Sequence, residues 1–162
     1  MDKAFTLENY FKQNVSPLDL PNKDELYNSV LQIENSMTER LDVLNIANIF
    51  ILEASQLLAN SIYLFENGYF DASFYSIRQS IELATTMMYF ADNKDDNTKK
   101  KALYDWKKEN RFPMTKQMLS ELKIYGEVVA NMYTVMPSFF ADLDILYAKI
   151  NKIVHKQGYD YL

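Results

Sequence analysis

The chain has 162 residues, which is enough for one domain with a substantial hydrophobic core, since single domains commonly contain about 100–200 residues. Apolar residues make up 48% of the chain and aromatic residues 14%, a composition too hydrophobic for a disordered protein. The absence of cysteine excludes disulfides, thiolate metal sites and a cysteine nucleophile. The formal net charge of −5 disfavours broad adhesion to nucleic acid or anionic membranes, although a local basic patch remains compatible with phosphate binding.

Glycine and proline are scarce, with 3 and 4 copies, whereas an all-β chain needs a turn about every 8–12 residues. Composition therefore predicts an all-α fold. We expect an up-and-down bundle of four long helices with one or two shorter helices. We also expect a single domain over residues 1–162, with an N-terminal helix and proline-containing arm at 1–22 and the bundle at 23–158.

The N-terminus lacks the basic and apolar segments of a secretory leader. The most apolar segment, 46–65, is interrupted by polar side chains, whereas a membrane-spanning helix needs about 20 largely apolar residues. These features favour a cytoplasmic protein without membrane contact. The ratio of 14 lysines to 3 arginines is typical of an AT-rich bacterial genome.

The first half of the chain contains three predicted helices. A short helix is expected at 5–13, before Pro17 and Pro21 disfavour helical backbone. A polar helix is expected from Lys23 to about Arg40, and residues 44–65 keep the helical period over about six turns until Asn67-Gly68 provides a stop. The apolar stripe of the polar helix is Leu26, Val30, Ile33 and Met37.

After Gly68, another long helix is expected to pair with 44–65 as an antiparallel hairpin at the centre of the core. A polar connection then leads into a charged helix through Tyr104 and Trp106. The expected buried stripe of the long helix is Phe70, Phe74, Ile77, Ile81, Ala84 and Met88.

Two helices are predicted near the C-terminus. The first runs from Thr115 to about Met136 and contains Gly126 as a weak point. The second opens at Pro137 and ends near Gly158, which occupies a typical position after a helix. The expected buried stripe of this last helix is Phe139, Leu143, Leu146, Ile150 and Ile153.

Arg78 and Glu82 are four residues apart on the second helix of the hairpin, about 100° from its apolar stripe. One interpretation is an intrahelical salt bridge that stabilises the helix by a few tenths of a kcal/mol. The other is a charge pair that orients a polar groove at the boundary of the core.

The final helix carries Lys149, Asn151, Lys152 and His155, the single histidine of the chain. Asn151 and His155 share a helix face, while the two lysines lie to the side. An imidazole, an amide and ammonium groups together could handle a phosphodiester. Basic residues at a helix C-terminus also suit the helix dipole, and this alternative needs no function.

Several kinds of site are excluded by motif. The three glycines are isolated from one another, so no glycine-rich nucleotide loop is present. A di-iron bundle needs two Glu-x-x-His pairs, and Lys152 stands three residues before His155. We therefore expect no metal and no cofactor.

The segment Ser76-Ile77-Arg78-Gln79-Ser80-Ile81-Glu82-Leu83, followed much later by a basic residue, an Asn and a helix-terminal His, resembles the HEPN superfamily of helical bundles. The signature of that family is an Arg, four to six arbitrary residues and a His. The matching window here is Lys149-x5-His155, with Asn151 in the spacer and lysine in place of arginine. The resemblance covers roughly residues 41–160.

Active HEPN proteins are dimers that cut RNA without metal, so the resemblance implies a homodimer with RNA as substrate. It implies an acid–base role for His155 at a ribose 2′-OH and a charge-stabilising role for Lys149 or Lys152. The resulting hypothesis is a metal-independent endoribonuclease of a bacterial defence or toxin–antitoxin type. Its site would comprise His155, Asn151, Lys149, Arg78 and Glu82, meeting in a groove across a two-fold axis.

The alternative is a noncatalytic helical module for dimerisation or docking, because many HEPN members are fused to other domains or paired with a cognate protein. The chain contains 12 Tyr, 10 Phe and 8 Met, residue types enriched at contact surfaces. A small-ligand pocket within the bundle is a third possibility that no motif specifies.

Overall fold

The computed structural model describes residues 17–36, 43–92, 101, 104–105, 108 and 115–155. Several expected features lie outside the described residues: the short helix at 5–13, Met37 of the expected apolar stripe, the tryptophan at 106 and the glycine at 158.

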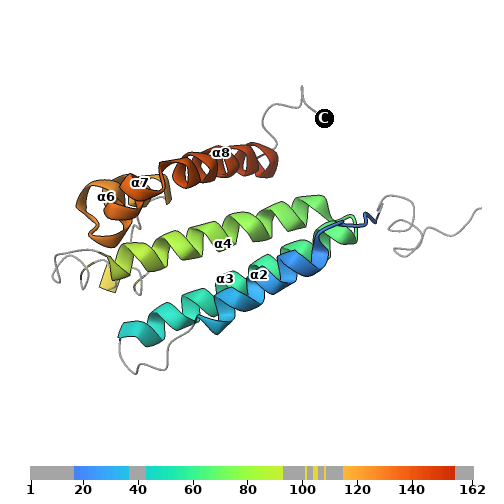
Figure 1. Ribbon diagram of the computed structural model, residues 1–162, viewed down its shortest axis with the longest axis horizontal. Coiled ribbons are helices and arrows are strands. Elements are labelled where there is room, and N and C mark those ends of the chain that lie inside the picture. Colours follow the sequence, from blue (N-terminus) through green and yellow to red (C-terminus); the bar gives the residue numbers. More distant parts are fainter. Residues whose placement is uncertain are drawn as a thin grey trace, which may run out of the picture.

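Within the described residues the fold is all-α, as predicted, and contains no β-strand. Figure 1 shows α4 in the middle of the molecule, with α3 and α2 on one side, α8 on the other, and α6 and α7 beside the end of α4. The helix bounds are α2 Lys23–Asn35, α3 Val43–Glu66, α4 Phe70–Ala91, α6 Thr115–Tyr125, α7 Val128–Val135 and α8 Pro137–Val154.

The predicted hairpin of α3 and α4 turns at Gly68, which has a φ of 80°. The amide of Tyr69 donates to the Leu64 carbonyl at 2.8 Å, and the amide of Gly68 donates to the Phe65 carbonyl at 3.0 Å. These two bonds form a Schellman motif, in which the residue after the helix adopts left-handed backbone that glycine tolerates without strain. The predicted stop at this glycine is confirmed.

The packing of α3 on α4 differs from the expected apolar stripe, because the most buried residues of α4 are small and polar. The Ser73 hydroxyl donates to the Ser61 carbonyl at 2.8 Å, and the Ser80 hydroxyl donates to the Ala54 carbonyl at 3.0 Å. Hydroxyls that reach the opposing backbone require the two helices to approach closely. The six residues predicted to be buried are all only partly buried: Phe70, Phe74, Ile77, Ile81, Ala84 and Met88.

Helix α8 is also rotated relative to the prediction. Of the predicted stripe, Ile150 is buried and Leu143 packs against the core, but Phe139, Leu146 and Ile153 are 49%, 46% and 38% exposed. The other buried residues of this helix are Phe140 and Val154. The polar side chains next to this buried face of α8 therefore point towards α4.

Helix α2 differs from its prediction in length and burial. It ends at Asn35 rather than near Arg40. Of its predicted stripe, Val30 is buried but Leu26 and Ile33 are exposed, because α2 packs mainly along α3.

The helix expected from Thr115 to Met136 is divided into α6 and α7. The Asp92 carboxylate, directly after α4, accepts hydrogen bonds from the amides of Glu127, Val128 and Val129 at 3.1, 2.8 and 2.7 Å. A carboxylate at a helix N-terminus satisfies free amides and suits the helix dipole. This cap starts a new helix at α7 and ties it to the end of α4.

Candidate functional site

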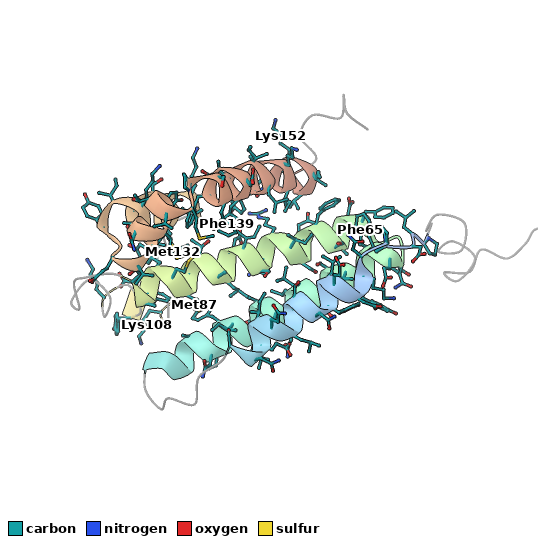
Figure 2. The ribbon with its side chains drawn as sticks, viewed as in Figure 1. Phe65, Met87, Lys108, Met132, Phe139 and Lys152 are labelled. Atoms are coloured by element: carbon teal, nitrogen blue, oxygen red, sulfur yellow. The ribbon has the colours of Figure 1, made fainter. Side chains whose placement is uncertain are left out.

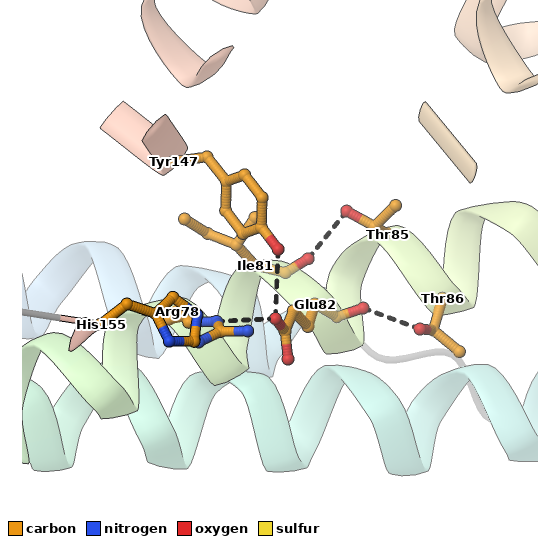
Figure 3. Close-up of polar contacts among 7 residues, drawn as sticks. All are labelled: Arg78, Ile81, Glu82, Thr85, Thr86, Tyr147 and His155. Atoms are coloured by element: carbon orange, nitrogen blue, oxygen red, sulfur yellow. Dashed lines mark hydrogen bonds and ion pairs between the residues drawn. The ribbon is translucent and has the colours of Figure 1, made fainter. Parts of the chain in front are cut away.

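The face between α4 and α8 brings together residues that are distant in sequence. Arg78 Nε donates to Glu82 Oε1 at 2.9 Å, so the intrahelical pair predicted from their spacing is present. Arg78 Nη1 lies 3.1 Å from Nε2 of His155, 77 residues later in the chain (Figure 3). The contact forms within one chain, whereas we expected these side chains to meet across a two-fold axis.

Tyr147 completes this cluster and was missed in the sequence analysis. Its hydroxyl donates to Glu82 Oε1 at 3.1 Å, so one carboxylate oxygen accepts from both Arg78 and Tyr147 (Figure 3). Tyr147, Asn151 and His155 recur at every fourth position of the last helix, a polar series that could have identified Tyr147. We refer to Arg78, Glu82, Tyr147 and His155 as the α4–α8 cluster.

The contact between Arg78 and His155 determines which ring nitrogen of His155 carries the proton. A guanidinium group is always protonated and has no lone pair, so it can only donate. Nε2 of His155 must therefore accept, and the proton of the neutral ring lies on Nδ1. In this arrangement the lone pair on Nε2 is held by Arg78.

Arg78 is held mainly by Glu82. Partial burial alone lowers the pKa of Arg78, but the hydrogen bond and charge of Glu82, with a smaller effect of Tyr147, outweigh it and leave the pKa raised. The side chains of Arg78 and Glu82 are 24% and 26% exposed, and His155 is exposed at the end of α8. Solvent therefore reaches the guanidinium and the imidazole, and an anion could approach both.

Asn151 lies on α8 between Tyr147 and His155, one helical turn from each. Its Oδ1 atom is buried and has no hydrogen-bond partner among the described residues. The position agrees with the expected shared face of Asn151 and His155, but no hydrogen bond joins Asn151 to the α4–α8 cluster.

The two lysines of the predicted site do not join the cluster. The side chains of Lys149 and Lys152 are exposed and make no hydrogen bond or ion pair within the part of the chain that the structure describes. Figure 2 shows Lys152 on the outer side of α8, away from α4. The positive charge beside His155 thus comes from Arg78 rather than from α8.

Tyr75 lies on α4 three residues before Arg78 and contacts the same end of α8. Its hydroxyl donates to the Val154 carbonyl at 3.2 Å, directly before His155. The residue is 52% exposed. An aromatic ring is thereby held at the surface beside the last residue of α8.

A concave region of about 430 Å³ lies apart from the α4–α8 cluster, at the start of α2 and the end of α3. Lys23 and Glu66 form an ion pair of 2.9 Å across it, and the carboxylate raises the pKa of Lys23. Its remaining lining residues are Pro17, Leu18, Asp19, Tyr27, Tyr63 and Asn67. The lysine and glutamate neutralise each other, and the carboxylate of Asp19 is the remaining charged group of this lining.

The described residues contain no group of three or more His, Asp or Glu side chains placed to hold a metal ion. None of the helices in the described ranges is both long and apolar enough to cross a membrane. Comparisons with family models, curated proteins and solved structures found no match to this chain.

Proposed function

We propose that the α4–α8 cluster cleaves RNA by metal-independent acid–base chemistry, as the resemblance to HEPN proteins implies. The observation that carries the proposal is the 3.1 Å contact between Arg78 Nη1 and His155 Nε2, which places a fixed cation beside the only imidazole. We also propose that α2, α3, α4 and α8 form an up-and-down bundle. The proposed location of the protein is the cytoplasm.

The contact suggests how the two groups share the reaction. A substrate phosphate attracts the guanidinium of Arg78, which can bind two phosphate oxygens at once. As Arg78 turns to the phosphate, it leaves Nε2 of His155 free to take the proton of the ribose 2′-OH. The 2′ oxygen then bonds to phosphorus, the bond to the 5′ oxygen breaks, and water protonates that oxygen.

Arg78 also stabilises the negative charge that builds on the phosphate oxygens in the transition state. Glu82 accepts from Arg78 and Tyr147, and this pairing keeps the guanidinium on the α8 side of α4 while it turns from His155 to the phosphate. The products expected are a 2′,3′-cyclic phosphate and a free 5′-hydroxyl.

The direct test is cleavage of labelled single-stranded RNA in EDTA by the wild type, His155→Ala and Arg78→Lys. His155→Ala removes the base and should abolish cleavage. Arg78→Lys keeps the positive charge but loses the planar guanidinium that can bind two phosphate oxygens at once. It should lower the cleavage rate by about 100-fold or more. His155 is exposed at a helix end, so His155→Ala should fold normally.

Lys116→Ala and Lys149→Ala serve as matched controls. Each removes one exposed positive charge, the first on α6 and the second on the outer side of α8. Lys149→Ala should weaken binding slightly, in a salt-dependent manner, and leave the maximal rate intact. Wild-type cleavage that disappears in EDTA, or persists in His155→Ala, would contradict the proposal.

A noncatalytic role in self-association is the second candidate, and the exposed apolar residues of α8 favour it. Phe139, Leu146 and Ile153 are spaced by seven and lie along one line of the helix. A row of large exposed apolar side chains is typical of an interaction surface. A homodimer through this row should have twice the chain mass in light scattering, and Leu146→Asp should reduce it to a monomer.

A further inference from the structure

Tyr75 has a feature that the chemistry above does not use. Its ring is half exposed, yet its hydroxyl is fixed by the bond to the Val154 carbonyl at 3.2 Å. An exposed tyrosine side chain normally moves among several rotamers, and a tethered one loses less entropy when it binds. The surface of α4 therefore presents a preorganised aromatic face.

The position of this ring is as specific as its orientation. Tyr75 precedes Arg78 by three residues, so both side chains lie on the same side of α4. The carbonyl that holds Tyr75 belongs to the residue before His155. The hydroxyl is thus fixed one residue before His155, and the ring shares a face of α4 with Arg78.

We propose that Tyr75 is a base-stacking residue that binds the nucleotide next to the phosphate held by Arg78. The inference rests on the proposed RNA cleavage, since it places the base relative to that phosphate. Nucleobases stack on aromatic rings largely irrespective of sequence, and only unpaired bases expose their faces. Tyr75 would therefore select single-stranded over duplex RNA.

The test uses a single-stranded oligonucleotide that carries one 2′-O-methyl nucleotide and cannot be cleaved. Binding is measured by anisotropy, with 2-aminopurine placed beside the modified nucleotide to report stacking. Tyr75→Leu should weaken binding by about five- to 150-fold, the range seen for loss of one stacked base. It should also remove the quenching of 2-aminopurine.

Tyr75→Phe and Tyr125→Leu are the controls. Tyr75→Phe keeps the ring and loses the tether to Val154, so its affinity should lie between those of the wild type and Tyr75→Leu. Tyr125 is 65% exposed at the end of α6, and Figure 1 shows α6 at the end of α4 that is distant from the C-terminal end of α8. Tyr125→Leu should bind like the wild type.

An abasic nucleotide at the stacking position gives a double-mutant cycle. It should weaken wild-type binding by the same factor as Tyr75→Leu, and the two changes together should cost no more than either alone. Additive losses, or unchanged quenching in Tyr75→Leu, would overturn the inference. If the wild type and Tyr75→Leu cleave RNA equally fast at limiting RNA, the stacking role is overturned and the proposed cleavage is not.

The binding assay does not depend on cleavage, so it separates the two proposals. If the wild type cleaves no RNA in EDTA, the proposed function fails. Quenching that depends on Tyr75 would still support the stacking role in that case, and its absence would overturn it.

Discussion

The carboxylate of Asp92 occupies the space where a side chain at position 126 would begin. A Cβ built on Gly126 would lie 2.6 Å from Asp92 Oδ2 and would collide with the Leu122 carbonyl oxygen. The same carboxylate caps α7 through three backbone amides. The absence of a side chain at Gly126 is therefore what allows the end of α4 to join α6 and α7.

Gly126→Ala should lower the free energy of unfolding by about 1–3 kcal/mol, since the backbone must shift to relieve the overlap. Unfolding in urea, followed by circular dichroism, measures the loss. Asn131→Ala, at an exposed position of α7, is the control and should change stability by less than about 0.5 kcal/mol. Equal stability of the two variants would show that Asp92 does not limit the space at Gly126.

The close approach of α3 and α4 depends on small buried residues, and Ser80 tests it. Ser80→Leu should destabilise the protein by about 1–3 kcal/mol because no room exists for the added atoms. Ser80→Ala loses only the hydrogen bond to the Ala54 carbonyl and should cost about 0.5–1.5 kcal/mol. Ser120→Leu, on the exposed side of α6, should leave stability nearly unchanged. The measurement is the melting temperature of each of the three variants, which should be lowest for Ser80→Leu.

Tyr89 should make stability depend on pH in the alkaline range. Burial, together with the hydrogen bond and charge of Glu121, raises the pKa of Tyr89 to about 12, whereas an unfolded tyrosine has a pKa near 10. The folded state holds the proton more tightly. The contribution of Tyr89 to stability is therefore complete below about pH 10 and is lost as the pH rises through about 12.

Denaturant unfolding of the wild type and Tyr89→Phe across this range isolates the effect. The wild type should lose more stability than Tyr89→Phe between about pH 10 and pH 12, because over this range the unfolded wild type releases the Tyr89 proton that the folded state retains. Parallel pH profiles for the two proteins would rule out the raised pKa. Tyr125→Phe, which alters an exposed ring, should follow the wild type.

Glu82 and Tyr147 act through Arg78, and their variants should affect rate rather than binding. Glu82→Gln removes the charge that holds the guanidinium and should lower kcat for RNA cleavage by about 10- to 100-fold. Tyr147→Phe removes one of two donors to Glu82 Oε1, so its effect on kcat should be about two- to tenfold.

A largely unchanged KM and melting temperature in Tyr147→Phe would support a positioning role. A fall in melting temperature with unchanged kcat would instead assign Tyr147 to the fold alone. Tyr133→Phe is the control for Tyr147→Phe, because it removes a hydroxyl from a half-buried ring that stacks on Phe140 away from the cluster.

Helix positions could be read from the sequence because apolar periodicity and the glycine at position 68 act locally. The division at Gly126 could not, since it depends on Asp92, which approaches from 34 residues earlier in the chain. The prediction of the buried face was wrong for α4 and partly wrong for α8, where Ile150 is buried but Phe139, Leu146 and Ile153 are exposed. Ser73 and Ser80 are buried instead through hydroxyls that donate to backbone carbonyls.

The candidate site was partly predictable for the same reason. The spacing of Arg78 and Glu82 predicts their ion pair, which needs only one helix. The approach of His155 to Arg78 depends on how α8 rotates on α4, and the apolar stripe indicated a different rotation. That rotation also explains why Tyr147 was missed and why Lys149 lies apart from the cluster.

The distance in sequence between Arg78 and His155 also has a consequence during translation. A nascent chain that has left the ribosome up to α4 can already form the α3–α4 hairpin, with Arg78 and Glu82 in place, but it has no imidazole. The pairing of guanidinium and imidazole arises only after α8 has emerged and docked. An activity that depends on both groups therefore cannot arise while the ribosome is still translating this part of the chain.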